Sequence, residues 1–304
     1  MTPLFQDPLV QLALPALLAG VVAILATLAV ERFGGGLGGI LSTIPSTIVP
    51  AAIGMYGDQS NTDDFRRTMA FIPIGILLNA GYLVLWRIVP AMVARRTHSH
   101  LLAWTVALSL SAWLIAATVI MLLHEAFQPT VTQSLAIGCL ASFAGLVVGI
   151  AASRTPHPTP RGHHGVSRRV LLVRGTAAAI AIGVALVLAR LGLPVASGLA
   201  SVFPAIFTTI LVATWIAQGA HVTTGAVGPM ALGTLSISAF ALLAALLFPL
   251  MNLALAATLA WTIAVACVSV PAYLFLGHRR RRAQLQHIAP SPHGSDKQRV
   301  EQRQ

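Results

Sequence analysis

The feature that most constrains this chain is a pair of apolar stretches that are each interrupted by glycine and proline. The first runs from Arg32 to Gly57 and contains five glycines before Ile40, as well as Pro45 and Pro50. The second runs from Arg190 to Gln218, about half a chain later. Both residue types disfavour an uninterrupted helix. Paired interrupted segments in the two halves of a membrane protein are typical of substrate sites between inverted repeats.

The two stretches can be aligned with each other. Placing Pro45 on Pro204 also places Gly39 on Gly198 and keeps a serine three residues before each proline. This order of small, hydroxyl and proline residues is the sequence evidence for a repeat. We therefore expect two halves that build one site from equivalent segments.

The chain as a whole has the composition of a multi-pass membrane protein. Of its 304 residues, 56% are hydrophobic and only 9% are charged, and the mean hydropathy is +0.82. These values exclude an ordinary soluble domain. The formal net charge of +11 comes from arginines in short runs between apolar segments. We therefore assign this charge to membrane topology and expect no nucleic-acid partner.

Nine stretches are long and apolar enough to cross the bilayer, at roughly 20 residues for about 30 Å of hydrocarbon. They are predicted near residues 8–31, 37–57, 68–92, 101–124, 131–152, 169–190, 196–218, 226–249 and 252–276. The fold class that follows is all-α. The sequence predicts a polytopic membrane protein of about nine transmembrane helices, with helices two and seven interrupted by Gly and Pro.

Charge and proline content divide the chain into four parts. Residues 1–153 form a first repeat of five helices, and residues 169–276 form a second repeat of four. Residues 154–168 are a basic linker rich in His and Pro, and residues 277–304 are a basic tail that we expect to be disordered. Five spans separate the start of the first repeat from the start of the second, and an odd number reverses orientation, so the 5+4 arrangement predicts inverted topology.

The distribution of arginine predicts the orientation. Placing the linker and the tail in the cytoplasm puts the N-terminus outside and the C-terminus inside. The single lysine among nineteen basic residues indicates a GC-rich bacterial genome. The predicted location is therefore the cytoplasmic (inner) membrane of a bacterium.

The polar residues of the interrupted stretches are the predicted substrate site. A half-helix that begins near Pro45 would turn its positive N-terminal end toward a cavity, where a carboxylate or phosphate can dock. The candidate substrate-binding residues are Ser42, Thr43, Pro45, Ser46, Thr47, Asn79, Ser197, Ser201, Pro204, Thr208 and Thr209. In the alternative interpretation, the prolines only kink helices and the glycines serve helix packing.

Three further residues have two interpretations each. Asn79 falls near the centre of the third predicted span, where its amide needs either a solute or a neighbouring helix as partner. Arg32 and Arg190 lie near opposite membrane faces in this topology. They are candidate gating residues, or anchors whose charged ends reach the headgroups.

The positions of the carboxylates and histidines limit which solutes and reactions the chain can support. None of the eight Asp and Glu residues lies in the middle of a predicted span. This disfavours a central proton relay and leaves a neutral or anionic solute, facilitated diffusion, or sodium held by backbone carbonyls. His124 and Glu125 adjoin without a nucleophile motif, and the linker histidines lack metal-ligand spacing. We therefore expect neither enzymatic activity nor a metal or other cofactor.

Together these patterns predict a secondary transporter or facilitator for a small neutral or anionic solute, with a site at the membrane midplane between inverted repeats. The alternative is a non-transporting scaffold or subunit of a membrane complex, whose Gly-rich faces pack on partner helices. The expected partners are membrane lipid and the small-molecule solute. Assembly into a homo-oligomer stays open.

Overall fold

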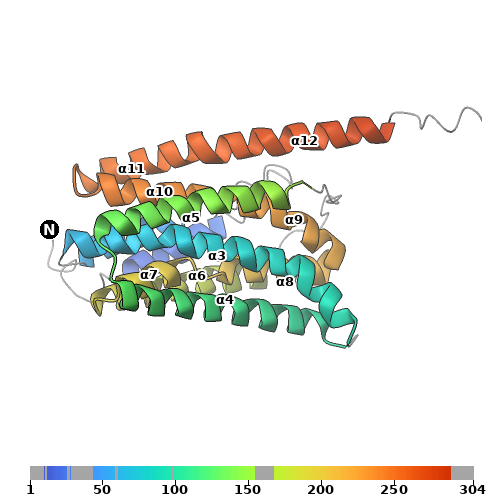
Figure 1. Cartoon of the computed structure of the whole chain (residues 1–304), viewed down its shortest axis with the longest axis horizontal. Coiled ribbons are helices and arrows are strands. Elements are labelled where there is room, and N and C mark those ends of the chain that lie inside the picture. Colours follow the sequence, from blue (N-terminus) through green and yellow to red (C-terminus); the bar gives the residue numbers. More distant parts are fainter. Residues whose placement is uncertain are drawn as a thin grey trace, which may run out of the picture.

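The fold is all-α, as a computed structural model of the chain shows (Figure 1). The structure describes residues 10, 12–25, 28, 44–58, 61–96, 99–154 and 168–288. Within these ranges, seven helices are long and apolar enough to cross a membrane. These helices give the chain the character of a multi-pass integral membrane protein.

The seven candidate spans coincide with the third to ninth predicted ones. Four are single helices: α3 (Thr62–Ala94), α4 (Leu101–Phe127), α5 (Val131–Ala152) and α6 (Arg168–Arg190). Three are composite: α7 (Pro194–Ser201) with α8 (Ala205–Gln218), α9 (Ala220–Gly233) with α10 (Leu235–Leu247), and α11 (Leu253–Ala264) with the π-helical turn η2 (Val265–Ser269) and α12 (Val270–Ile288). The first two predicted spans lie partly outside the described residues. Their described parts are the shorter helices Leu12–Leu25 and α2 (Ile48–Asp58).

Helix α3 is the central helix of the bundle. In its most apolar stretch 72% of the residues are buried, against 17% in α4, which presents most of its surface outward. Figure 1 shows α3 between α4 and α5, with α7 and α8 lying along it. A helix apolar on all sides suits such a position. The polar groups that α3 carries in its middle are therefore enclosed by protein.

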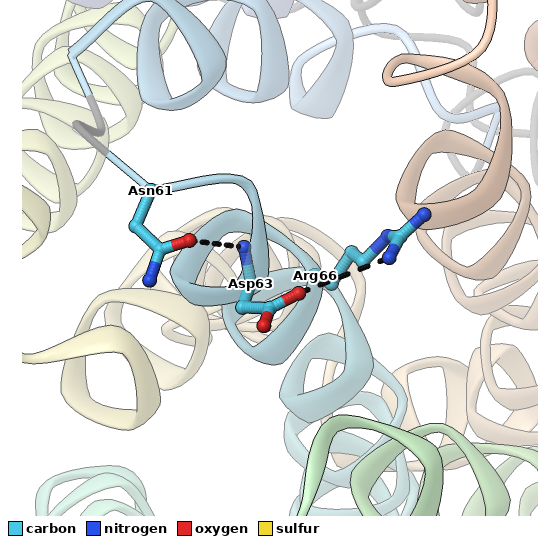
Figure 2. Close-up of polar contacts among 3 residues, drawn as sticks. All are labelled: Asn61, Asp63 and Arg66. Atoms are coloured by element: carbon cyan, nitrogen blue, oxygen red, sulfur yellow. Dashed lines mark hydrogen bonds and ion pairs between the residues drawn. The ribbon is translucent and has the colours of Figure 1, made fainter.

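Polar capping marks the start of α3 (Figure 2). The side chain of Asn61 accepts a hydrogen bond from the backbone N–H of Asp63 at 3.0 Å. Asp63 also lies 3.8 Å from the Arg66 guanidinium, in an ion pair that is partly exposed. A cap of this kind and an acidic first turn favour helix initiation. Their charge places this end of α3 outside the apolar layer.

The last helix is longer than the sequence predicts. α12 continues to Ile288, so residues 277–288, which the composition assigns to a disordered tail, are helical in the structure. The prediction did not allow for helix propagation, because Arg, Gln and Leu are good helix formers even where the segment is polar. The remainder of the tail, residues 289–304, lies outside the described residues.

Small residues allow the helices to approach closely. A Cβ atom at Gly138 would lie 2.6 Å from the backbone oxygen of Ala70, and one at Gly198 would lie 2.5 Å from that of Thr68. Both contacts bring a neighbouring helix against the backbone of α3. Close packing through glycine is a main source of helix association in membranes.

Replacing Gly198 by alanine should lower the free energy of unfolding by about 1–3 kcal/mol, since the added methyl group forces α7 away from α3. The matched control is Gly81→Ala on α3, where an added Cβ meets no atom within 4 Å. That change should leave stability unchanged or raise it by up to about 1 kcal/mol through helix propensity. Thermal unfolding of the purified protein in detergent compares them. Equal melting temperatures for the two variants would contradict this packing.

Candidate functional site

The span formed by α7 and α8, which is the seventh of the nine predicted spans, is broken where the sequence predicts an interruption. α7 ends at Ser201 and α8 begins at Ala205, with Val202 to Pro204 in between. Proline lacks an N–H donor and disfavours the helical conformation in the residue before it, which accounts for the break. The consequence is that backbone groups are freed near the middle of a membrane span.

The first interrupted stretch is irregular at its described start. Residues 44–47 are not helical, and α2 begins at Ile48, three residues after Pro45, where the sequence predicts a start near Pro45 itself. Pro50 lies in the first turn of α2, where its missing N–H costs no intrahelical bond. Ser42, Thr43 and Arg32 lie outside the described residues, as do Gly34 to Gly39.

Helices α2 and α8 run in opposite directions along α3. Tyr56 of α2 meets Phe65 with ring centroids 4.9 Å apart, so α2 runs toward the start of α3. Trp215 of α8 meets Trp86 at 6.0 Å, so α8 runs toward the end of α3. Their N-terminal ends therefore lie between these contacts, at the level of Asn79. Both ends carry the positive pole of a helix dipole.

A cavity of about 60 Å³ lies where these helix ends meet. Its polar lining consists of Ser46 and Thr47 before α2, Asn79 of α3, Ser201 at the end of α7, and Arg174 of α6. The other lining residues are aliphatic or aromatic. The structure thus brings both interrupted stretches and the amide of the third span to one cavity.

Asn79 holds the break in place. Its side-chain NH₂ group donates to the backbone oxygen of Val202 at 2.8 Å, and its side-chain oxygen accepts from Trp113 Nε1 at 2.8 Å. Asn79 is 1% exposed and Trp113 4% exposed. The amide therefore has the helix partners that one interpretation of the sequence expected, and it also lines the cavity.

Several predicted hydroxyl groups bond to backbone oxygens. Ser197 donates to Ala185 of α6 at 2.8 Å, which ties α7 to α6. Thr208 donates to Pro204 at 2.6 Å, and Thr209 donates to Ile206 at 2.9 Å. These three residues and the buried Pro204 are not among the cavity-lining residues. Their contacts shape the break, whereas Ser46, Thr47, Asn79 and Ser201 reach the cavity itself.

The two cavity serines keep capacity for a further bond. Ser46 Oγ donates to Ile44 at 3.3 Å, and Ser201 Oγ donates to Gly198 at 2.7 Å. A hydroxyl that donates its hydrogen still has two lone pairs, and its donor can be re-aimed by rotation. Both serines can therefore contact a molecule in the cavity.

The two predicted gating arginines are not at the cavity. Arg190 is the last residue of α6 and is exposed, and Arg32 lies outside the described residues. Arg174 was not among the predicted site residues, although it falls within the predicted span 169–190; it is buried and lines the cavity. Its position six residues after the start of α6 is the signal that could have distinguished it from a loop arginine.

No protein-family model matches this chain, and the comparisons with curated proteins and with solved structures found no match either. Fold likeness therefore contributes no argument about function. What the cavity can do is argued from the residues that line it.

Proposed function

We propose that this chain is a secondary transporter or facilitator that moves a small neutral or anionic solute through the cavity beside Asn79. The observation that carries the proposal is the meeting of two interrupted segments, 44–48 and 201–207, at one cavity. Broken helices at membrane depth are tolerated where they line a cavity, because freed backbone groups need polar partners there. Substrate sites of many transporters are built in this way.

The N-terminal ends of α2 and α8 can supply hydrogen-bond donors and positive potential to a solute at such a site. The N–H groups of a first helical turn have no intrahelical partner, and the dipole adds positive potential. With the hydroxyls of Ser46 and Ser201, these groups can replace the water that a solute loses on entering the membrane. The opposite directions of α2 and α8 also support the inverted repeat that we propose for the two halves.

A solute that binds this site should stabilise the folded protein. We expect a ligand at about 100 times its dissociation constant to add roughly 2.7 kcal/mol to the free energy of unfolding. The measurement is the melting temperature in detergent against a library of small organic anions, neutral metabolites and sodium. Ser46→Ala and Ser201→Ala should each weaken the stabilisation. Thr209→Ala, which removes a similar back-bonded hydroxyl away from the cavity, should not.

A hit from the library then leads to a flux assay in proteoliposomes. The carrier proposal requires uptake of the stabilising solute into vesicles that contain the protein, and reduced uptake with Ser201→Ala. A folded protein that no member of the library stabilises would exclude the proposal. It would also direct attention to the alternative of a scaffold or complex subunit.

The glycine faces of the described helices pack within the chain, whereas the Gly34 to Gly39 run lies outside the described residues. Gly138 packs against α3, and Gly149 packs against Leu232 of α9, within the same chain. These small-residue faces are therefore occupied by the chain's own helices and do not require a partner protein. The inner membrane, with the N-terminus outside, is the location that we propose for this activity.

A further inference from the structure

Arg174 stands out among the polar groups of the cavity. Of the described residues it is the only charged one that is buried, at 7% exposure. It lines the cavity, and its Nε atom has no hydrogen-bond partner in the described part of the chain. No Asp or Glu of the described ranges lines the cavity. The guanidinium therefore brings to the site a positive charge that the lining does not neutralise.

Such an arrangement is costly unless something else offsets it. The desolvation penalty of a buried charge is several kcal/mol, and a long arginine in a membrane helix normally extends to the headgroups instead. Arg87 shows the usual structural solution, because its guanidinium donates to the backbone oxygens of Ala152 and Thr224 at 2.7 and 3.0 Å. Arg174 Nε has no such partner among the described residues, so its N–H is available to an occupant of the cavity.

The other polar groups around the cavity also contribute positive electrostatic potential or hydrogen-bond donors. The N-terminal ends of α2 and α8 both point toward it, and each adds positive potential. Asn79 uses one of its two N–H groups on Val202. The other N–H group is a further donor. A site made of a guanidinium, helix N-terminal ends and an amide donor suits an anion.

We propose that this cavity binds a small monovalent oxyanion, with two of its oxygens held by the guanidinium of Arg174. The proposal rests on the proposed function and names the class of solute for the same site. The planar fork of arginine matches two oxygens of a carboxylate or nitrate better than it matches a single atom.

The size of the cavity limits the occupant. A volume of about 60 Å³ is far below the roughly 300–1,000 Å³ of pockets for drug-sized ligands. It exceeds the roughly 10–15 Å³ that one water molecule requires on this scale. An anion of a few heavy atoms, such as formate or nitrate, fits this range, and a sugar phosphate or a lipid headgroup does not.

The test uses the full-length protein in detergent, with sodium formate and sodium nitrate as probes. Sodium chloride at the same ionic strength is the reference, and formamide is the neutral analogue of formate. Formate and nitrate should raise the melting temperature in a saturable way, and formamide should not. Stabilisation by formamide equal to that by formate would overturn the proposal.

Variants of Arg174 identify the group responsible. Arg174→Met should raise the half-saturating concentration of formate about 10- to 100-fold, because charge-assisted hydrogen bonds are lost. Arg174→Lys should raise it about tenfold, because the charge remains without the fork. Arg169→Met, an exposed arginine of the same helix, is the matched control and should leave it unchanged. Equal affinity in Arg174→Met and the original protein would overturn the proposal.

The behaviour without ligand separates a binding role from a structural one. Arg174→Met should melt at or above the original temperature, since a buried unpaired charge is removed. A clear drop would show that the arginine has a partner within the chain, and would overturn the proposal. Glu31 lies outside the described residues, so Glu31→Gln is tested as well. Anion stabilisation seen only in that variant would identify Glu31 as the partner, with the same consequence.

The two proposals can fail separately. A neutral solute that stabilises the original protein and Arg174→Met alike, and that enters proteoliposomes, would support the carrier and overturn the anion site. Formate binding that depends on Arg174, without flux of formate into proteoliposomes, would support the anion site and count against transport.

Discussion

Replacing Asn79 by leucine should lower the free energy of unfolding by about 2–4 kcal/mol, because two buried groups lose their partners at about 1–3 kcal/mol each. These groups are the backbone oxygen of Val202 and the Nε1–H of Trp113, both bonded to Asn79 at 2.8 Å. Average interhelical hydrogen bonds in membranes contribute only about 0.6 kcal/mol, since the unfolded chain finds other partners. Here a single side chain bonds two elements, so its removal leaves both the Val202 oxygen and Trp113 Nε1 without this partner.

A second substitution apportions this loss. Trp113→Phe removes the indole N–H and leaves only the Val202 oxygen to be satisfied. In Asn79→Leu combined with Trp113→Phe, the total loss should be smaller than the sum of the two single losses by about 1 kcal/mol, which is the coupling of a bonded pair. Chemical or thermal unfolding in detergent measures each variant. A loss below about 0.5 kcal/mol for Asn79→Leu, typical of an uninvolved surface position, would show that Asn79 does not hold the break.

The pairing of the two interrupted stretches was open to prediction from sequence. Pro204 and the glycines of both stretches affect the local backbone conformation whatever packs around them, so their effect can be predicted from sequence. The break before Ala205 and the irregular start before Ile48 follow from these residues. That both meet Asn79 at one cavity is a result of tertiary packing.

The role of Arg174 was not open to prediction in the same way. An arginine near the start of a span normally reaches the headgroups, and only the packing of neighbouring helices decides whether its side chain turns inward. Gly175 next to it allows the helix Leu12–Leu25 to approach, since a Cβ there would lie 2.6 Å from Ile24. Burial of Arg174 therefore depends on a contact between distant segments, which no local pattern reveals.

The serine hydroxyl groups show a second limit of prediction from sequence. Ser197 and Ser201 look equivalent in sequence, as both lie in the interrupted stretch at helical spacing. The structure directs Ser197 toward the backbone of α6 and Ser201 toward the cavity. On a helix, residues four apart share a face but meet different neighbours along it. Residue type and spacing thus identify the segment of the site, whereas the individual contacts depend on tertiary packing.

Arg87 and Arg174 allow a test of what separates a structural arginine from a ligand-binding one. Arg87 is half-buried in α3, and it donates to the last residue of α5, Ala152, and to Thr224 of α9. A cation at the C-terminal end of α5 also interacts favourably with the helix dipole. Arg87→Met should therefore lower the free energy of unfolding by about 2–4 kcal/mol, because two charge-assisted bonds are lost. Arg87→Lys should recover part of this loss.

The matched control for Arg87→Met is Arg95→Met, which changes an exposed arginine at the end of the same helix. It should alter stability by less than about 0.5 kcal/mol. Melting temperatures of Arg87→Met, Arg95→Met and Arg174→Met are compared in one detergent without added anion. Arg87→Met should fall well below the original protein, whereas Arg174→Met should equal or exceed it. A fall of similar size for both would mean that the two arginines are held in the same way. A fall for Arg87→Met without a fall for Arg174→Met agrees with one charge bonded within the chain and one available to a solute.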